Sequence, residues 1–215
     1  MLDESERGPA PELVAAALRK RWAVSEHLFD RFLPYELRLV SDQYWTPLVV
    51  AMRVADWLDE FGVKSVVDIG AGAGKFCIAT ALASTCRFIG LEHRPQLVEI
   101  ARALASKFQL GERVQFIEGA VGEVTLPEAD AYYLFNPFGE NLMPSYEYLD
   151  VAVELGEDRY VHDVTYMERF LEEAPRGTYV IKYNGFGGRM PETYEAIRVD
   201  REMPSVLRLW QKVRP

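Results

Sequence analysis

Hydrophobic positions along this chain fall into two patterns, short apolar runs and longer amphipathic repeats, and the two alternate. Apolar runs of strand length occupy five segments: 65–69, 87–91, 114–118, 131–135 and 178–183. Repeats with helical spacing lie between them and predict three helices: 75–84, 95–108 and a stretch within 146–174. Strands and helices in alternation are typical of a doubly wound α/β sheet with helices on both faces.

The end of the chain breaks this alternation. Two extended runs, 194–199 and 206–213, follow the fifth predicted strand, and Met203-Pro204 separates them. Two consecutive extended runs divided by a proline-containing turn are typical of an antiparallel hairpin. We therefore predict a doubly wound sheet of seven strands that ends in an antiparallel hairpin.

The N-terminal part lies outside the alternating pattern. Residues 1–10 are predicted to form a loose tail, whereas 11–33 show the spacing of one or two amphipathic helices that cover the sheet or, alternatively, form a substrate lid. A further helix begins at Thr46-Pro47 and runs to about residue 61. The sequence thus predicts a tail and helical extension over 1–41 and one ligand-binding domain over 42–215.

Composition limits the class of protein. A chain of 215 residues suffices for one α/β domain with a small addition, and 49% hydrophobic content argues against wholesale disorder. No apolar run has the length of a bilayer span, and the first six residues are acidic where a signal peptide would be basic, so we expect a cytoplasmic protein without a membrane partner. Cys77 and Cys86 lie in predicted core elements, and we expect reduced structural thiols there. The three histidines show no metal-site spacing, so no metal is expected.

The net charge of −9 is concentrated in one segment. Residues 140–173 hold ten acids and two bases, a net charge of −8, whereas 174–215 hold eight bases and four acids, a net charge of +4. A solvated helical face is the plainest explanation of the acidic segment. An acidic surface also repels phosphate backbones, so nucleic acid is disfavoured as a partner, although the basic C-terminal part leaves it open.

The chain's strongest motif is an acid followed by three alternate glycines: Asp68, Gly70, Gly72 and Gly74. Glycine accepts positive φ and lets the backbone approach a ligand closely, and the helix that follows offers unpaired N–H groups to the same crevice. The segment therefore predicts a nucleotide-binding turn. A tight strand-to-helix turn without a ligand is the alternative.

Two common nucleotide motifs fit this turn poorly. A phosphate-binding P-loop needs glycine and a hydroxyl residue at positions where the chain has Ile69 and Phe76. A dinucleotide fingerprint needs its third glycine where the chain has Lys75 or Cys77. The P-loop is excluded, and the dinucleotide fingerprint is weakened.

The remaining pattern, acid-x-Gly-x-Gly-x-Gly over 68–74, resembles motif I of the class I, Rossmann-like S-adenosylmethionine-dependent methyltransferases. The resemblance implies the seven-stranded methyltransferase sheet and S-adenosyl-L-methionine as the cofactor. It further implies that Gly70, Gly72 and Gly74 hold the methionine end of the cofactor, and that Asp68 acts through the loop and bound water near its amino group.

Glu92 comes 24 residues after Asp68, at the end of the second predicted strand. A carboxylate there can accept both ribose hydroxyls of an adenosine-containing ligand. In the family, an aspartate just after the third strand often accepts a hydrogen bond from the adenine amino group, but this chain has Ala120 at that position. The adenine contact is left open, with Glu118 or a backbone carbonyl as substitutes.

Asn136-Pro137-Phe138, at the end of the fourth predicted strand, resembles the Asn-Pro-Pro-aromatic motif of amino-group methyltransferases, without its second proline. The resemblance implies that Asn136 lies beside the cofactor and aligns an acceptor nitrogen with the methyl group. It also implies that Phe138 packs on a planar substrate. A strand-terminating turn with a buried phenylalanine is the alternative for Phe138.

Upstream, Gln43-Tyr44-Trp45-Thr46-Pro47 is similar to the aromatic-Thr-Pro element that precedes motif I in several adenine-amino methyltransferases. The resemblance implies a cofactor-binding role for Tyr44 or Trp45, next to Thr46. Packing of these aromatic side chains in the core is the alternative.

Together these motifs predict an S-adenosylmethionine-dependent methyltransferase that acts on a nitrogen acceptor of a small molecule or a protein. Catalysis would come chiefly from alignment of donor and acceptor, with Glu118, Glu140 or Tyr183 as candidate bases. A nucleic-acid amino-group methyltransferase and a non-catalytic cofactor-binding partner subunit are the alternatives.

Overall fold

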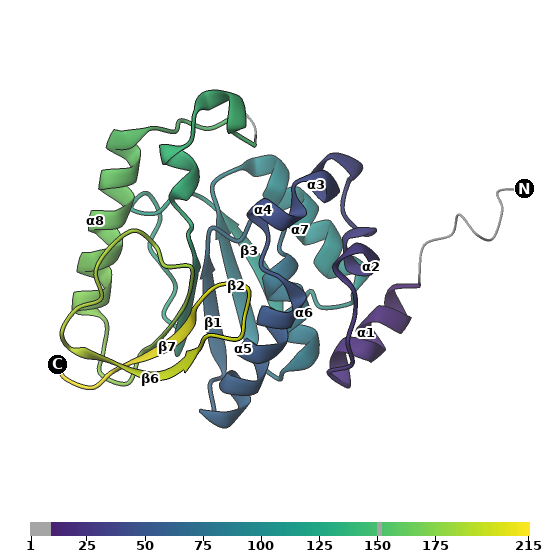
Figure 1. The fold of residues 1–215 in the computed structure, drawn as a ribbon, viewed down its shortest axis with the longest axis horizontal. Coiled ribbons are helices and arrows are strands. Elements are labelled where there is room, and N and C mark those ends of the chain that lie inside the picture. The colour runs from purple at the N-terminus through teal and green to yellow at the C-terminus, as the bar shows by residue number, and fades with distance from the viewer. Residues whose placement is uncertain (1–9, 150–151) are drawn as a thin grey trace, which may run out of the picture.

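The structure is a computed structural model that describes residues 10–149 and 152–215. The described strands are β1 (Ser65–Ile69), β2 (Arg87–Glu92), β3 (Val114–Glu118), β4 (Ala131–Phe135), β5 (Tyr179–Tyr183), β6 (Tyr194–Asp200) and β7 (Leu207–Lys212). They form one sheet in the order β3-β2-β1-β4-β5-β7-β6, in which β1 to β5 are parallel and β7 is antiparallel to both neighbours. The predicted doubly wound sheet with a terminal hairpin is confirmed (Figure 1).

The helices are α1 (Pro11–Arg19), α2 (Glu26–Asp30), α3 (Tyr35–Leu39), α4 (Ser41–Tyr44), α5 (Leu48–Glu60), α6 (Lys75–Ala83), α7 (Pro95–Lys107) and α8 (Glu157–Glu173). Two 3-10 helices, η2 (Gly139–Leu142) and η3 (Ser145–Glu147), follow β4. The sequence did not predict α3 and α4, because helices of five and four residues are too short to show a periodic pattern.

Two apolar layers sandwich the sheet, because successive side chains of a strand point to opposite faces. Val66 belongs to the larger layer, which includes buried residues of α1, α2, α5, α6 and α7. Val67 and Ile69 belong to the smaller layer, where Met167 and Leu171 of α8 pack. Figure 1 shows α8 on one side of the sheet and α5, α6 and α7 on the other.

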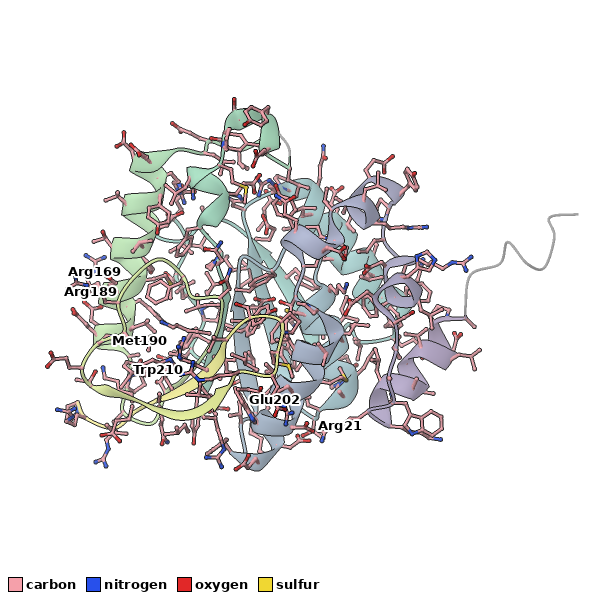
Figure 2. All side chains as sticks on the ribbon, in the orientation of Figure 1. Arg21, Arg169, Arg189, Met190, Glu202 and Trp210 are labelled. Carbon is pink, nitrogen blue, oxygen red and sulfur yellow. The ribbon has the colours of Figure 1, made fainter. Side chains whose placement is uncertain are left out.

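The N-terminal helices belong to the larger layer. Leu18 of α1 and Phe29 of α2 are fully buried in it. Just after α1, the Arg21 guanidinium donates from Nη2 to the Ala83 carbonyl at the end of α6 (3.0 Å). It also pairs with Asp56 of α5 (2.7 Å). Figure 2 labels Arg21. The extension is thus fastened to the helical face of the sheet.

Cys77 and Cys86 are buried free thiols. Within 10–149 and 152–215, no three acidic, histidine or cysteine side chains are grouped as a metal site would require. Across the same residues, no helix combines the length and the apolar character needed to cross a bilayer.

Candidate functional site

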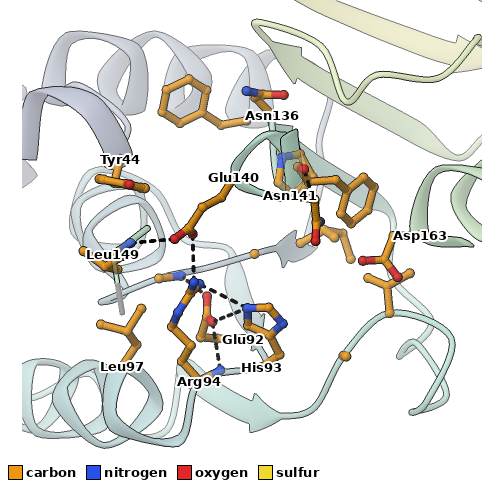
Figure 3. A pocket seen from close by; sticks show the side chains of 18 of the residues that line it. Tyr44, Glu92, His93, Arg94, Leu97, Asn136, Glu140, Asn141, Leu149 and Asp163 are labelled. Carbon is orange, nitrogen blue, oxygen red and sulfur yellow. Dashed lines mark hydrogen bonds and ion pairs between the residues drawn. The ribbon is translucent and has the colours of Figure 1, made fainter. Parts of the chain in front are cut away.

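A cavity opens where the parallel strands end at their carboxyl edge (Figure 3). Its walls come from the turns after the five parallel strands β1 to β5, from α4, from η2 and the segment that follows it, and from α8. Counted out to open solvent, the space between these walls is about 980 Å³. Open α/β sheets bind their ligands at this edge.

The glycine turn after β1 packs tightly on three sides. Gly70, Gly72 and Gly74 have φ values of +76°, +55° and +79°. A Cβ on Gly70 would lie 2.9 Å from Pro137, and a Cβ on Gly72 would lie 2.3 Å from the Trp45 ring. Gly70 and Gly72 line the cavity; Gly74 does not, and it packs against Phe116 instead.

Asp68 lies behind the turn and does not line the main cavity. It is 3% exposed, accepts a hydrogen bond from the Cys77 thiol (3.3 Å), and burial raises its pKa to about 7. Thr46 lies nearby, with 2.9 Å between its hydroxyl and that of Tyr133. Asp68 and Thr46 line a small second cavity that shares Gly70 with the main one. Their roles toward a cofactor stay predictions.

Lys75, the first residue of α6, is held by acids of the N-terminal extension. Its ammonium lies 2.6 Å from a carboxylate oxygen of Glu26 and 2.7 Å from one of Asp30, and it donates to the Ser41 hydroxyl (3.1 Å). The side chain is 3% exposed and does not line the main cavity. These partners agree with the exclusion of a P-loop, in which the lysine would meet phosphates.

Glu92 lines the cavity and connects two of its turns. One oxygen accepts the Gly72 N–H and the other accepts the Arg94 N–H, both at 2.9 Å. Burial raises the pKa of the Glu92 carboxyl, and the backbone donors of Arg94, Gly72 and His93, together with the Arg94 charge, oppose that rise. An ionised carboxylate has about four acceptor positions, so these backbone donors leave about one position for a hydroxyl donor from a ligand.

Arg94 and Glu140 pair across the cavity wall at 2.9 Å, and the other Glu140 oxygen accepts the Leu149 N–H at 2.6 Å. Figure 3 shows these contacts beside Glu92 and His93. The loop after β2 is therefore joined to the segment between η3 and α8 by a single carboxylate. Sequence spacing carried no signal for this pairing over 46 residues.

Asn136 lines the cavity in a left-handed backbone conformation, with φ of +42°. Its N–H donates to the Gly185 carbonyl (2.8 Å), which ties the end of β4 to the loop after β5. Its side chain is exposed at the cavity, and Pro137 beside it packs against Gly70. The predicted acceptor-aligning amide therefore shares one cavity with Gly72 and Glu92.

Phe138 belongs to the smaller apolar layer, together with Leu134 and Val180. The ring is 4% exposed and part of it lines the cavity. This burial agrees with the alternative of a core phenylalanine, while a contact with substrate stays a prediction.

Tyr44 and Trp45 bring the N-terminal helices to the cavity, and both line it. The Tyr44 hydroxyl donates to the Glu147 carbonyl in η3 (2.8 Å), and burial together with the charge of Glu140 raises its pKa. The Trp45 indole N–H donates to the Leu37 carbonyl (3.2 Å). Tyr44 thereby connects α4 with the segment after η2.

Several residues of the cavity wall carried no signal in the sequence, among them the polar Asn141, Arg159 and Asp163. They lie in the acidic segment, where nothing in the spacing distinguishes a cavity residue from a solvated one. Of the candidate bases, Glu140 lines the cavity, whereas exposed Glu118 and buried Tyr183 do not. Burial also raises the pKa of Tyr183, so its hydroxyl keeps its proton at neutral pH.

The residues present fit an extended adenosine ligand. Gly70 and Gly72 line the cavity, and because Pro137 and the Trp45 ring fill the places where their Cβ atoms would lie, the turn presents only its backbone there. Glu92 is a buried carboxylate with acceptor capacity left beside that turn. These two features occupy adjacent strand ends, as the cofactor's methionine and ribose parts require.

Comparison with known proteins agrees with this description. Residues 62–147 match the family model of a methyltransferase domain. A probable histone-arginine methyltransferase from Oryza sativa subsp. indica is 30% identical over 92 residues, which cover 40% of this chain and 17% of that protein. The relative from subsp. japonica matches to the same extent. The match thus spans about one sixth of the length of the curated relatives.

Solved structures share the fold at low identity. An RNA methyltransferase from Salinibacter ruber, in complex with S-adenosyl-L-homocysteine, has a TM-score of 0.56 at 22% identity and covers 79% of this chain and 94% of its own. An O-methyltransferase from Bacillus cereus, also in complex with S-adenosyl-L-homocysteine, has a TM-score of 0.58 at 12% identity, with 93% and 97% covered. TrmN from Thermus thermophilus has a TM-score of 0.60 at 15% identity, with 86% and 53% covered.

Proposed function

We propose that this chain, whose residues 62–147 match the model of a methyltransferase domain, transfers the methyl group of S-adenosyl-L-methionine to a nitrogen acceptor on a small molecule or a protein. The observation that carries this proposal is the meeting of Gly72, Glu92 and Asn136 in one cavity. Gly72 and Glu92 can bind the cofactor, and Asn136 can bind an acceptor beside it.

The cofactor supplies an activated methyl group on a sulfonium, and this chain's residues supply alignment. The Asn136 amide oxygen accepts an N–H of the acceptor and holds the nitrogen lone pair toward the methyl group. The left-handed backbone at Asn136, fixed by its bond to Gly185, keeps that amide at the cavity. Glu140 is engaged by Arg94 and Leu149, so it holds the wall rather than taking a proton.

A nitrogen acceptor is supported by the resemblance at Asn136 and by the curated relative, whose name gives arginine as its target. The similar solved structures include an O-methyltransferase and an RNA methyltransferase, but at their low sequence identity they support the fold and not the type of acceptor. A protein or small molecule is favoured over nucleic acid as the substrate, because the acidic segment 140–173 contributes to the cavity wall and would repel phosphates. Two of its acids, Glu140 and Asp163, line the cavity.

Two measurements test the proposal. Calorimetry with S-adenosyl-L-homocysteine and with NAD tests the cofactor; binding of NAD alone would reject it. Transfer of label from methyl-labelled S-adenosyl-L-methionine into a fractionated lysate tests the acceptor. Label in protein or small molecules supports the proposal, whereas label only in RNA or DNA, or binding without any transfer, would replace it with one of the two alternatives.

A further inference from the structure

The cavity continues past Glu92 to the loop after β3. Glu92 and Glu118 are opposite each other in the parallel pairing of β2 and β3, and Gly119, Ala120 and Val121 line the cavity just beyond. A ligand that has one end at the turn after β1 and its ribose at Glu92 therefore extends its base toward this loop. The Ala120 side chain offers that base no hydrogen-bonding group.

Helix α8 places a carboxylate at the same end. Asp163 is 5% exposed and lines the cavity. In the view of Figure 3, Asp163 and Asn141 lie at the opposite end of the cavity from Tyr44 and Leu97. Nothing in the sequence distinguishes Asp163 from the other acids of 140–173, because only the fold brings it to the same cavity as Ala120.

Arg159 fastens this carboxylate to the loop after β3. Its Nη2 donates to the Val121 carbonyl (3.2 Å) and its Nη1 pairs with Glu123 (2.6 Å), so α8 is tied to that loop. Its Nε lies 2.9 Å from an oxygen of Asp163, four residues later on the same helix. The Asp163 carboxylate is thereby held at a fixed place relative to Ala120.

Asp163 has acceptor capacity beyond these contacts. The Arg159 Nε contacts both of its oxygens (2.9 and 3.0 Å), and the His162 Nδ1 contacts one of them (3.0 Å). These three contacts leave about one of the roughly four acceptor positions of an ionised carboxylate for a ligand. A buried carboxylate in a cavity wall is matched by a ligand that donates N–H bonds.

We propose that Asp163 accepts a hydrogen bond from the exocyclic amino group of the cofactor's adenine, and so takes the place that Ala120 cannot fill. The proposal rests on the proposed function, since it needs the adenosine part of the cofactor in this cavity. Adenine recognition then comes from α8, which Arg159 ties to the loop after β3. Arg159 acts as a positioning residue.

The test compares two ligands by calorimetry: S-adenosyl-L-homocysteine, and its analogue in which hydrogen replaces the adenine amino group. We expect the unaltered protein to bind the first about ten- to a hundredfold more tightly, as a hydrogen bond to a charged group provides. Asp163→Ala should bind both ligands equally, with the analogue's affinity unchanged. Asp163→Asn, which keeps the size of the side chain, should retain a reduced preference. Asp158→Ala, an exposed acid on the same helix, is the matched control.

The outcomes separate the two proposals. If the unaltered protein binds S-adenosyl-L-homocysteine but does not distinguish the analogue, or if both Asp163 variants keep the full preference, the role of Asp163 is rejected and the methyltransferase function stands. If the protein binds neither ligand, both proposals fail. Affinity for the analogue shows that a variant is folded, and Asp163→Asn keeps the test decisive should Asp163→Ala not fold.

Discussion

Arg94 and Glu140 form an ion pair across the cavity wall, with 2.9 Å between Nη2 and Oε2. Arg94 follows β2 and Glu140 lies in η2 after β4, so the pair joins two loops that are far apart in the sequence. The two side chains are 6% and 12% exposed, which makes this a buried pair. Because Glu140 also accepts the Leu149 N–H, one carboxylate holds the segment that covers the cavity.

Glu140→Ala should therefore destabilise the protein and speed the release of S-adenosyl-L-homocysteine. Removal of one member of a buried pair typically costs about 3–5 kcal/mol, and we expect about 3 kcal/mol in urea unfolding. Glu140→Gln, which still accepts hydrogen bonds, should cost less. Glu147→Ala removes an exposed acid from the same segment and is the control. Equal stability losses in Glu140→Ala and Glu147→Ala would contradict the role of the pair.

Position 72 needs a glycine because the Trp45 ring packs against it, as well as because a ligand would approach the backbone there. A Cβ at Gly72 would lie 2.3 Å from the Trp45 ring, and the φ of +55° disfavours any side chain. We expect Gly72→Val to abolish binding of S-adenosyl-L-homocysteine, and Gly72→Ala to weaken it while shifting the tryptophan fluorescence. Gly111→Ala, where a Cβ meets nothing within 4 Å, should leave both unchanged.

A double-mutant cycle tests whether a side chain at position 72 acts by clashing with the Trp45 ring or only by excluding the ligand. If the Trp45 contact causes the loss, Gly72→Ala should cost less stability in a Trp45→Ala background, by about 0.5–3 kcal/mol. Strict additivity of the two changes would show instead that Trp45 does not limit the residue at position 72.

The strands were predictable from the sequence, because buried parallel strands are continuous apolar runs bounded by polar residues. The glycine turn and Glu92 were also predictable, since their positions depend on local spacing alone. Asp163 and the Arg94–Glu140 pair were not, because they depend on how α8 and η2 pack against loops distant in sequence. The tight contact of Gly72 with Trp45 has the same origin.

Lys75 illustrates a second limit of the sequence. A lysine after a glycine turn suggests phosphate binding, yet its ammonium is buried against Glu26 and Asp30. Lys75→Met should cost about 3–5 kcal/mol in urea unfolding, because it leaves buried Asp30 without its cation. Lys64→Met, at an exposed lysine, should change stability by less than about 0.5 kcal/mol. A similarly small effect of Lys75→Met would show that the N-terminal helices are held without this contact.

Asn136→Gly separates alignment of the acceptor from binding of the cofactor. The change removes the amide but suits the backbone, whose φ is +42°. We expect an unchanged affinity for S-adenosyl-L-homocysteine and a fall in kcat of about a hundredfold, as misplacement of a reacting group causes. Gln109→Gly makes the same change at another left-handed residue, outside the cavity, and should leave kcat unaltered. An equal loss of cofactor binding in Asn136→Gly would reject this division of roles.

Asp68 should give the stability of the protein a characteristic pH dependence. Burial raises the pKa of its carboxyl to about 7, whereas an aspartate in an unfolded chain has a pKa of about 3.9. Between these pH values the folded protein keeps a proton that the unfolded chain has released. The stabilising contribution is therefore complete below about pH 4 and is lost as the pH rises to about 7.

Asp68→Asn removes this titration and keeps an oxygen that can accept from the Cys77 thiol. Relative to the unaltered protein, the variant should gain about 3 kcal/mol of unfolding free energy between pH 5 and pH 8, since two pKa units separate pH 5 from the folded pKa. Urea unfolding at both pH values measures the gain, with Asp158→Asn as the exposed control. Parallel pH profiles for Asp68→Asn and the unaltered protein would mean that Asp68 is ionised in the folded state throughout this range, and that the turn or Cys77 stabilises its charge.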